Sequence, residues 1–482
     1  MKVLAKFSSG PIVFIALYLL PYQGVEPAGR LALAVFGWMI TWWMVQPVPW
    51  ALASLLPLVL FPMLNVKNIN ETVALYGQTI FFWIWGTVLL GYAMDRHGVA
   101  KRFALWFMSL RSINGSSYRI AFGFMLVTGL ISAVVSDAAT VAMMIPVAVS
   151  LIAFIRSVQP GSMERSNFGA FLSLGALYGA VAGGCATIAG IPHNALSVAL
   201  LERTTGRALG WFDWMRAGVP IFLVALVMFY FILRIFLPPE FKVVPGGVGF
   251  LVKEREKLGP MSSGERATLF VFSVMVFLFI LPSLISLALG SQHALTAWSN
   301  SALNLNVVPP LVLLLLFITP VDWRKNRFVL EWKEAVVHSP WDIMLLTTAA
   351  AAVVNVLVEF KYMELAGKAL SQFGVGTVSL PVVAAVTTGV ATNLISGVAA
   401  TAFFGGIFIP AADQIGFNPA SMAMLIPNTA LGFALPWAGA AAATAFATGQ
   451  ITMKNMIRIG LVATLGYVFV VVAVHLLLSP YV

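Results

Sequence analysis

Apolar segments long enough to cross a membrane recur along almost the whole chain. Hydrophobic residues make up 60% of the 482 residues and charged residues only 10%, against roughly 25% charged residues in soluble domains. The bilayer core offers no water to backbone groups, so helices that satisfy their own hydrogen bonds are the expected spanning elements. The sequence predicts an all-α polytopic membrane protein with about eleven transmembrane helices, each of about 20 mostly apolar residues.

Nine of the apolar segments are uninterrupted and are expected to be continuous spans. The mean hydropathy of +0.93 over the full length leaves little room for a soluble domain. The nine segments are 8–22, 30–45, 48–64, 77–95, 215–238, 267–288, 306–320, 341–358 and 456–478.

Four other segments are long enough to span but are interrupted. In 119–155 and 376–415, two apolar arms meet at a short polar tip, which suggests re-entrant hairpins. The segments 167–200 and 421–450 contain Gly and Pro in their middle, which suggests broken helices. Interrupted segments at corresponding positions of two halves are a sequence sign of a transporter binding site. Kinks in ordinary helices are the alternative, but four interruptions arranged in pairs favour the transporter.

The two halves of the chain also share a short motif and the same order of segments, which indicates an internal repeat. We expect N-terminal scaffold helices at 1–64, a first repeat at 65–238 and a second repeat at 267–482. The hydrophilic stretch 239–266 is expected to be a cytoplasmic connector. The shared motif reads Ser136-x-x-Ala139-x-x-Ala142 in the first half and Ser396-x-x-Ala399-x-x-Ala402 in the second.

The positive charges predict the orientation of the chain. With the N-terminus inside, 21 of the 28 Lys and Arg residues fall on the cytoplasmic side and seven outside. This bias matches the positive-inside rule and makes the two repeats inverted. The net charge of +10 is therefore an orientation signal, and no nucleic-acid partner is expected. A bacterial inner (plasma) membrane is the expected location.

Asp137 is the one charged residue between Arg119 and Arg156. A carboxylate in hydrocarbon costs a few kcal/mol or more, so such a residue usually serves an ion or substrate pathway. It sits at the first hairpin tip, where it could bind sodium or carry a proton, because desolvation disfavours the charged form. The alternative is that Asp137 only caps the second arm of the hairpin, since Asp is a favoured N-cap.

Several motifs, taken in order, resemble the divalent anion/sodium symporters, which carry dicarboxylates, citrate or sulfate. The resemblance covers nearly the whole chain. The motifs are Trp42-Trp43 with Leu55-Leu56-Pro57 through Pro62, Gly91-x-x-Met94-x-x-x-Gly98-x-x-Lys101-Arg102, Thr140-x-x-Met143-Met144-x-Pro146, Gly183-Gly184-x-x-Thr187-x-x-Gly190-x-Pro192-x-Asn194, Leu425-Ile426-Pro427 through Pro436, and Met453-x-x-Met456-x-Arg458-x-Gly460.

The resemblance implies inverted repeats, two re-entrant hairpins, a scaffold that forms a homodimer, and a transport part that moves like an elevator. In the family each hairpin tip reads Ser-Asn-Thr and holds sodium and the substrate carboxylates. This chain instead reads Ser136-Asp137-Ala138 and Ser396-Gly397-Val398. Its broken helices read Pro192-His193-Asn194 where Pro-Pro-Asn is usual, and Gly439-Ala440-Ala441-Ala442 where Thr-Pro-Pro-Asn is usual.

We predict an ion and substrate site formed by the two tips and the two breaks. Within it, Na⁺ ligands are expected at Ser132, Ser136, Asp137, Thr392 and Ser396, with Na⁺ or H⁺ as the coupling ion and no other cofactor. Whether His193 has a role, as a pH-sensitive group or as packing, stays open. The predicted site residues are Ser132, Ser136, Asp137, Ala138, Gly190, Pro192, His193, Asn194, Thr392, Ser396, Gly397, Val398, Pro436 and Gly439.

The function predicted is cation-coupled secondary transport of small anions, with di- or tricarboxylates ahead of sulfate. A proton-coupled carrier, an anion exchanger or a sodium/proton antiporter on the same fold is the alternative, with Asp137 carrying the ion. A membrane-embedded enzyme is disfavoured, because the sequence has no metal-ligand cluster, nucleophile–base pair or nucleotide loop. The expected partners are a small anionic substrate, membrane lipid and a second copy of the chain.

Overall fold

The structure of the chain is a computed structural model. It describes most of the chain, with gaps mainly near the N-terminus, in the loop before residue 165 and after residue 362. The described residues are 2–20, 26–113, 115–158, 165–207, 209–244, 246–290, 292–303, 306–362, 365, 368, 372, 374–393 and 395–479.

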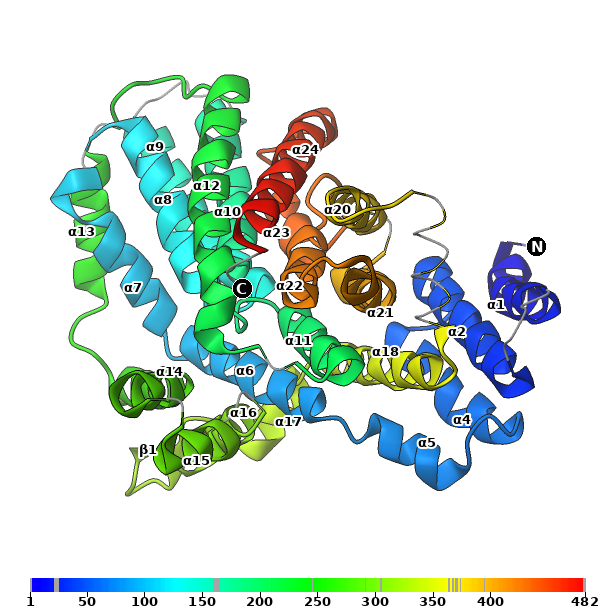
Figure 1. The fold of residues 1–482 in the computed structure, drawn as a ribbon. Helices are drawn as coiled ribbons and strands as arrows, with labels where there is room; N and C mark the ends of the chain where they lie inside the picture. The colour runs from blue at the N-terminus through cyan, green and yellow to red at the C-terminus, as the bar shows by residue number, and fades with distance from the viewer. Residues whose placement is uncertain are drawn as a thin grey trace.

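Two helical hairpins and two broken helices form the centre of the molecule (Figure 1). Each hairpin has two arms joined by a short tip, and each broken helix consists of two shorter helices joined by non-helical backbone. The hairpins are α8 (Ser117–Ser132) with α9 (Asp137–Val158), and α20 (Ser379–Ala391) with α21 (Gly397–Ile415). The broken helices are α10 (Asn167–Gly184) with α11 (Pro192–Thr205), and α22 (Pro419–Thr429) with α23 (Ala440–Ala447).

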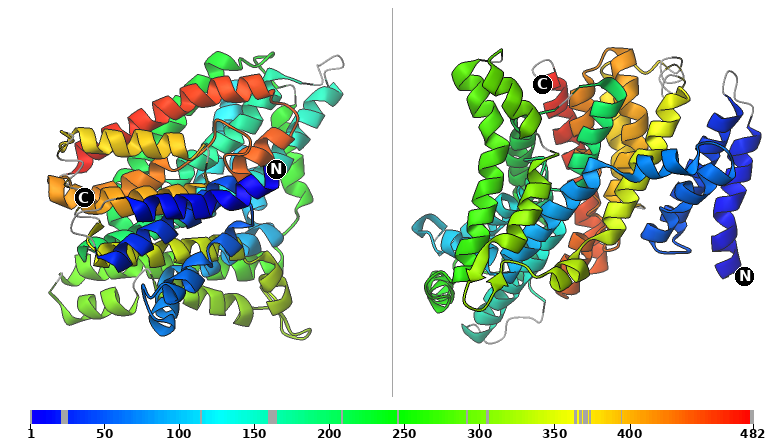
Figure 2. Two further views of the ribbon diagram at one scale, coloured as in Figure 1. Left: turned by 90° about the vertical axis from the view of Figure 1, so that its right-hand side faces the viewer. Right: turned by 90° about the horizontal axis from the view of Figure 1, so that it is seen from below.

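The remaining helices surround this centre. In Figure 1, α1 and α2 lie together at one edge, and α14, α15 and α16 lie at another. Figure 2 shows the same arrangement from two further directions. These elements are α1 (Lys2–Leu19), α2 (Pro27–Val45), α3 (Trp50–Ala53), α4 (Leu56–Met63), α5 (Ile69–Tyr76), α6 (Thr79–Arg96), α7 (Val99–Met108), η1 (Arg111–Ile113), α12 (Trp211–Phe236), α13 (Gly247–Lys257), α14 (Ser263–Leu289), α15 (Ala294–Ala302), α16 (Val308–Ile318), β1 (Pro320–Asp322), β2 (Arg327–Phe328), α17 (Trp332–His338), α18 (Trp341–Glu359) and α24 (Met453–Leu478).

Two of the expected continuous spans are wrong in detail. The segment 48–64 is two short helices, α3 and α4, separated at Ser54-Leu55. Pro57 stands in the first turn of α4 and has no N–H to donate to the carbonyl oxygen of Ala53, so it interrupts the helical hydrogen bonds between α3 and α4. The segment 306–320 contains a helix of only 11 residues, α16, which ends before the small antiparallel pair β1–β2.

Eight helices of the described chain are long and apolar enough to cross a membrane. They include α9 and α21, the second arms of the two hairpins, together with α12, α14, α18 and α24. The helix α6 continues from α5 as one apolar stretch. The first arms α8 and α20 have 16 and 13 residues, which is short for a full span of about 20 residues. Short arms suit hairpins that enter the membrane and return.

The contacts between helices recur in the two halves. In the first half α10 packs against α8, α9 and α12, and in the second α22 packs against α20, α21 and α24. The halves also exchange contacts, since α11 packs against α21 and α23 packs against α9. In each broken helix, the first segment (α10 or α22) therefore packs against the hairpin of its own repeat. The second segment (α11 or α23) packs against the hairpin of the other repeat.

The buried centre of the fold is α10, in which every residue from Phe168 to Gly184 is buried. A helix that is apolar on all sides is expected in such a position. Glycines allow α8 to approach it closely: a Cβ on Gly183 would lie 2.0 Å from the carbonyl oxygen of Gly129, and one on Gly179 would lie 2.5 Å from that of Met125. Small residues of this kind let two membrane helices pack backbone to backbone.

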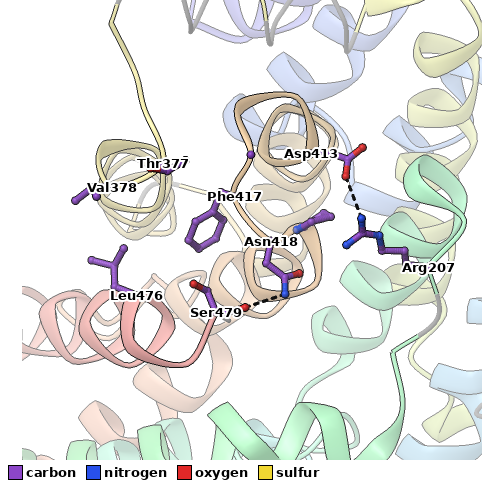
Figure 3. A pocket seen from close by; sticks show the side chains of 10 residues that line it. Arg207, Thr377, Val378, Asp413, Phe417, Asn418, Leu476 and Ser479 are labelled. Carbon is purple, nitrogen blue, oxygen red and sulfur yellow. Dashed lines mark hydrogen bonds and ion pairs between the residues drawn. The ribbon is translucent and has the colours of Figure 1, made fainter. Parts of the chain in front are cut away.

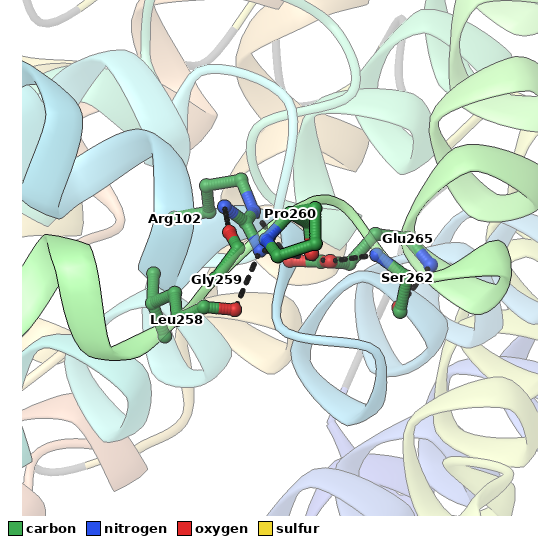
Figure 4. A network of polar contacts seen from close by, with 6 residues as sticks. All are labelled: Arg102, Leu258, Gly259, Pro260, Ser262 and Glu265. Carbon is green, nitrogen blue, oxygen red and sulfur yellow. Dashed lines mark hydrogen bonds and ion pairs between the residues drawn. The ribbon is translucent and has the colours of Figure 1, made fainter.

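A network of polar contacts anchors α7, the helix that leads from α6 into the first hairpin (Figure 4). Arg102 in α7 pairs with Glu265 in the first turn of α14 through Nε at 2.6 Å and Nη2 at 3.0 Å. It also donates to the carbonyl oxygen of Gly259 at 2.9 Å. Glu265 completes a capping box with Ser262 at the start of α14, a motif that satisfies free backbone donors. The contacts of Arg102 with Glu265 and Gly259 fix α7 to the start of α14 and to the loop before it.

The close packing of α8 and α10 is testable with Gly183→Val. The added side chain meets the Gly129 backbone, which has no flexible end that can move aside, so we expect destabilisation of at least about 1–3 kcal/mol. The readout is the apparent melting temperature of the purified protein in detergent. Gly249→Val in α13 is the matched control, because a Cβ there has no neighbour within 4 Å. Equal melting temperatures of the two variants would contradict the packing.

Candidate functional site

The first helix break, residues 185–191, is held together by the side chain of Asn194. Its Nδ2 donates to the carbonyl oxygens of Gly184 at 3.0 Å and Thr187 at 2.9 Å. Trp214 of α12 donates through Nε1 to the carbonyl oxygen of Cys185 at 2.9 Å. Carbonyls that lost their helical donors are thereby satisfied inside the protein, which non-helical backbone at membrane depth requires. The amide oxygen of Asn194 is buried and has no hydrogen-bond partner.

The first hairpin tip is fastened to this break by two hydroxyl groups. Ser132 at the end of α8 donates to the carbonyl oxygen of Ala180 in α10 at 2.8 Å. Thr187 in the break donates to the carbonyl oxygen of Ala133, and the amide N–H of Ala189 donates to the Thr187 hydroxyl at 3.2 Å. The tip and the break therefore form one oxygen-rich unit.

Asp137 is the first residue of α9 and is partly exposed. Its Oδ1 accepts a hydrogen bond from the N–H of Ala138 at 2.7 Å, and a carboxylate at a helix N-terminus is favoured by the helix dipole. None of the ion pairs among the described residues involves Asp137. The contact with Ala138 is consistent with a role of Asp137 at the helix start. Among the described residues, no basic side chain forms an ion pair with its carboxylate.

The second hairpin tip lies against the second helix break, residues 430–439, through main-chain contacts. A Cβ on Gly397 would lie 2.3 Å from the carbonyl oxygen of Ala430, and one on Gly432 would lie 2.5 Å from that of Thr392. Ser396 caps α21 by accepting from the N–H of Ala399 at 3.2 Å. This tip therefore presents main-chain atoms and a serine whose hydroxyl oxygen already caps α21. The first tip instead presents a carboxylate.

The predicted site residues fall into two groups around the two breaks. Ser132, Ser136, Asp137 and Ala138 lie at the first tip, and Gly190 lies in the first break, which hydrogen bonds join to that tip. Thr392, Ser396, Gly397 and Val398 lie at the second tip, and His193 at the start of α11 lies beside Gly397. Pro192 and Asn194 also belong to the first turn of α11. Pro436 and Gly439 lie in the second break, where Gly439 is the N-cap of α23 and is exposed.

Two polar residues at the helix breaks, Thr187 and Asn428, were not predicted from the sequence as site residues. Thr187 joins the first tip to the first break, and its spacing after Gly183-Gly184 was a usable signal. Asn428 lies in the last turn of α22, is fully buried, and neither of its amide atoms has a partner. In the sequence, Asn428 could have been noticed as an amide side chain within the mostly apolar segment that forms α22.

The oxygen atoms of the first tip and the first break are candidate ligands for a hard monovalent cation. Such ions take several oxygen ligands, and the tip and the break that is hydrogen-bonded to it carry hydroxyl, carboxylate, amide and main-chain oxygens. The described residues contain no group of three or more His, Cys, Asp or Glu side chains that could hold a transition metal. The oxygen atoms of Ser132, Asp137 and Asn194 fit an alkali cation better than zinc or iron.

Two cavities border the hairpins and broken helices, and one of them reaches the first break. One of about 450 Å³ reaches Ile188 in the first break from the side of α6 and α14, and the acidic Glu202 and Asp213 contribute to its lining. Another of about 690 Å³ lies where α20, α21, α22 and α24 meet, with the ion pair of Arg207 and Asp413 at 3.4 Å (Figure 3). The first cavity gives a route to the broken helix, whereas the second lies at the far ends of the hairpin arms.

A family model described as the transmembrane region of sodium:sulfate symporters matches residues 2–480. The chain belongs to this family. Membership confirms the predicted resemblance and, with the eight long apolar helices, an integral membrane protein of the carrier class. It is not a family of membrane-embedded enzymes.

Curated relatives within this symporter family align over nearly the full length. A sodium-dependent dicarboxylate transporter, SdcS, of Staphylococcus saprophyticus is 28% identical over 483 residues, covering 98% of this chain and 90% of the relative. The transporter of the same name in Staphylococcus aureus is 26% identical over 487 residues, with the same coverage. The YdaH transporter of Alcanivorax borkumensis has a similar fold, with a TM-score of 0.56, 14% identity, and coverage of 87% of this chain and 89% of that chain.

The bridge formed by Asn194 is testable with Asn194→Asp. Aspartate keeps the size of the side chain but replaces the donor by an acceptor, so the carbonyls of Gly184 and Thr187 lose their partner and face a negative charge. An unsatisfied buried polar group costs about 1–3 kcal/mol, and more when it is charged. We expect a lower melting temperature in detergent.

The control for this prediction is Asn455→Asp at the start of α24, a position outside the break. The bridge is refuted if Asn194→Asp melts at the wild-type temperature, or no lower than Asn455→Asp.

Proposed function

We propose that the chain is a secondary transporter that moves small dicarboxylate-like anions across the membrane together with a cation. The full-length relatives named as sodium-dependent dicarboxylate transporters support this proposal. The observation that carries it is Asp137, a carboxylate without a basic partner among the described ion pairs, placed at an oxygen-lined hairpin tip.

The site can hold an anion without a basic side chain. The helices α11 and α21 begin at Pro192 and Gly397, two of the predicted site residues. Helix N-termini present free N–H groups and a partial positive charge to anions. A doubly negative substrate close to an ionised Asp137 is repelled, since like charges at short range cost energy. A cation at the first tip removes this repulsion, so binding of the cation and of the anion should depend on each other.

Sodium is the coupling ion favoured by the oxygen atoms around the first tip. Ser132, Ser136 and Asp137, with the free amide oxygen of Asn194, are the proposed ligands. At the second tip Thr392 and Ser396 supply weaker candidates, because the serine oxygen already caps α21. A proton on Asp137 is the alternative way to neutralise the same charge, and uptake under separate sodium and proton gradients distinguishes the two ions.

The proposed mechanism is alternating access by an elevator-like movement. The transport part comprises the hairpins and broken helices, and the scaffold contains α1 to α6 with α14 to α18, which we expect to form the dimer. The repeats would run from 65 to 238 and from 267 to 482 and be inverted, with the N-terminus in the cytoplasm. The recurring helix contacts of the two halves and the distribution of Lys and Arg support this arrangement.

Uptake by proteoliposomes tests the function directly. The purified protein is reconstituted, and accumulation of radiolabelled succinate is followed under an inward sodium gradient, an inward proton gradient, or neither. We expect accumulation under the sodium gradient. Accumulation only when the vesicles are preloaded with succinate indicates an exchanger, and sodium movement without any anion indicates an antiporter.

The role of Asp137 is tested with Asp137→Asn in the same vesicles. The neutral amide keeps an oxygen ligand but loses the charge that holds the cation, and charge-assisted contacts are roughly twice as strong as neutral ones. We expect the sodium concentration for half-maximal uptake to rise about tenfold, equivalent to ~1.4 kcal/mol.

Asp413→Asn is the matched control, because Asp413 pairs with Arg207 in a half-exposed position away from the tips. It should leave the sodium dependence unchanged. An unaltered sodium dependence and pH profile in Asp137→Asn would leave Asp137 as a helix cap only.

A further inference from the structure

A third cavity, of about 540 Å³, lies between α7, α13 and the start of α14. Both α13 and α14 pack against α7 (Figure 1). The cavity belongs to neither hairpin tip and to neither helix break, and its lining is partly apolar and partly basic. The distribution of Lys and Arg predicts that it faces the cytoplasm. Its exposed apolar side chains are Phe103, Trp106, Met261 and Leu269, and its charged ones are Arg102, Arg255 and Glu256.

The apolar wall of this cavity is not covered by the rest of the protein. Phe103 and Trp106, three positions apart, share one face of α7 and are 37% and 48% exposed. Leu269 in α14 is 38% exposed. A surface in water rarely keeps several large apolar side chains together without a partner, whereas tryptophan is enriched where a membrane meets water. The composition of the wall therefore favours contact with lipid.

The lining also follows α14 from its polar start into its apolar part. This helix is among the described helices that are long and apolar enough to span a membrane, and only 28% of its apolar window is buried by the protein. The lining begins at Gly259 in the loop before α14 and reaches Leu269, which lies about 9 Å along the helix axis from Ser263. A phospholipid has the same order, with a polar headgroup above apolar acyl chains.

The two arginines of the lining differ in how their charges are compensated. Arg102 is engaged by the protein, since it pairs with Glu265 at 2.6 Å and donates to the carbonyl oxygen of Gly259 at 2.9 Å (Figure 4). Arg255 donates from Nη1 to the hydroxyl of Ser109 at 3.0 Å, and none of the ion pairs among the described residues includes it. A guanidinium has five N–H donors, so Arg255 can hold an anion and keep its contact with Ser109.

The charges around the cavity favour an anionic ligand. Together α7, α13 and residues 258–266 carry six basic and three acidic side chains. Two of the acidic side chains are already paired, with Arg102 and Lys257. The third, Glu256, lines the cavity but is exposed, so water and salt screen its carboxylate. Basic side chains close to an anionic membrane surface are attracted to it, and basic pockets on the cytoplasmic side suit anionic headgroups.

We propose that this cavity binds an anionic phospholipid of the cytoplasmic leaflet, with the phosphate at Arg255 and an acyl chain along the apolar wall. The phosphate chemistry alone would also suit a soluble phosphate ester. The apolar wall decides for the lipid, because a soluble ester would leave Trp106 and Leu269 uncovered. The lipid site is separate from the ion and substrate site, so this inference does not rest on the proposed function.

Native mass spectrometry of the purified full-length chain tests the proposal by counting the lipids that stay bound. The protein is released from micelles that contain equal amounts of dioleoylphosphatidylglycerol, which is anionic, and dioleoylphosphatidylcholine, which is zwitterionic and has the same acyl chains. We expect the apparent Kd of phosphatidylglycerol in the wild type to be at least about fivefold lower than that of phosphatidylcholine. Arg255→Gln should raise the Kd of phosphatidylglycerol about fivefold, equivalent to ~1 kcal/mol, and leave that of phosphatidylcholine unchanged.

Lys454→Gln is the matched control. Lys454 is an exposed cation at the start of α24, which packs against α12, α20 and α22. Its replacement removes one positive charge from the same predicted face and should change neither Kd. Trp106→Ala should weaken the binding of both lipids, and Trp106→Phe should keep most of it, because the ring still covers the acyl chain. A melting temperature identifies any variant that fails to fold, and the two Trp106 variants carry the test if Arg255→Gln is one of these.

Four results would overturn the inference. Equal binding of the two lipids by the wild type would mean that the cavity holds bulk lipid without a preference for charge. Equal losses in Arg255→Gln and Lys454→Gln would assign the preference to the overall surface charge. Displacement of phosphatidylglycerol by glycerol 3-phosphate at similar concentrations would identify a soluble phosphate ester as the ligand. A loss of oligomers in Trp106→Ala with unchanged lipid binding would identify a second copy of the chain as the occupant of the cavity.

Discussion

The fold depends on satisfying backbone groups where two helices are broken inside an apolar protein. A helix interrupted at membrane depth leaves carbonyl and N–H groups that lipid cannot pair. At the first break, the amide of Asn194 bridges Gly184 and Thr187 while the indole of Trp214 pairs with Cys185. These contacts keep the backbone of the break non-helical without leaving these carbonyl oxygens unpaired.

The two tips carry different side chains on the same framework. The first tip carries the charge of Asp137 and several hydroxyl groups, and is suited to a cation. The second tip packs its Gly397 against the Ala430 carbonyl and the His193 ring, and is suited to an anion at the start of α21. This asymmetry is the basis for the proposed division of cation and anion between the two tips.

Much of the framework could be predicted from the sequence, because polar and glycine residues inside apolar segments are conspicuous. Ser136-Asp137 and Ser396-Gly397 marked the hairpin tips, and Gly190-Ile191-Pro192 marked the first break. The division of 48–64 into two helices was missed, since hydropathy hides the effect of Pro57. The contact between His193 and Gly397 was beyond reach, because it depends on how α11 packs against the opposite hairpin, and no local pattern encodes that distance. The proton and ligand assignments at both tips stay predictions.

The central claim is that a cation at the first tip neutralises Asp137 and thereby permits the anion to bind. Calorimetric titration of the purified protein with sodium, in the presence and absence of succinate, measures this coupling directly. Because coupling between two sites is reciprocal, each ligand should lower the Kd of the other by the same factor. That factor should be large in the wild type and fall towards one in Asp137→Asn. A succinate Kd that does not change with sodium in the wild type would contradict the account.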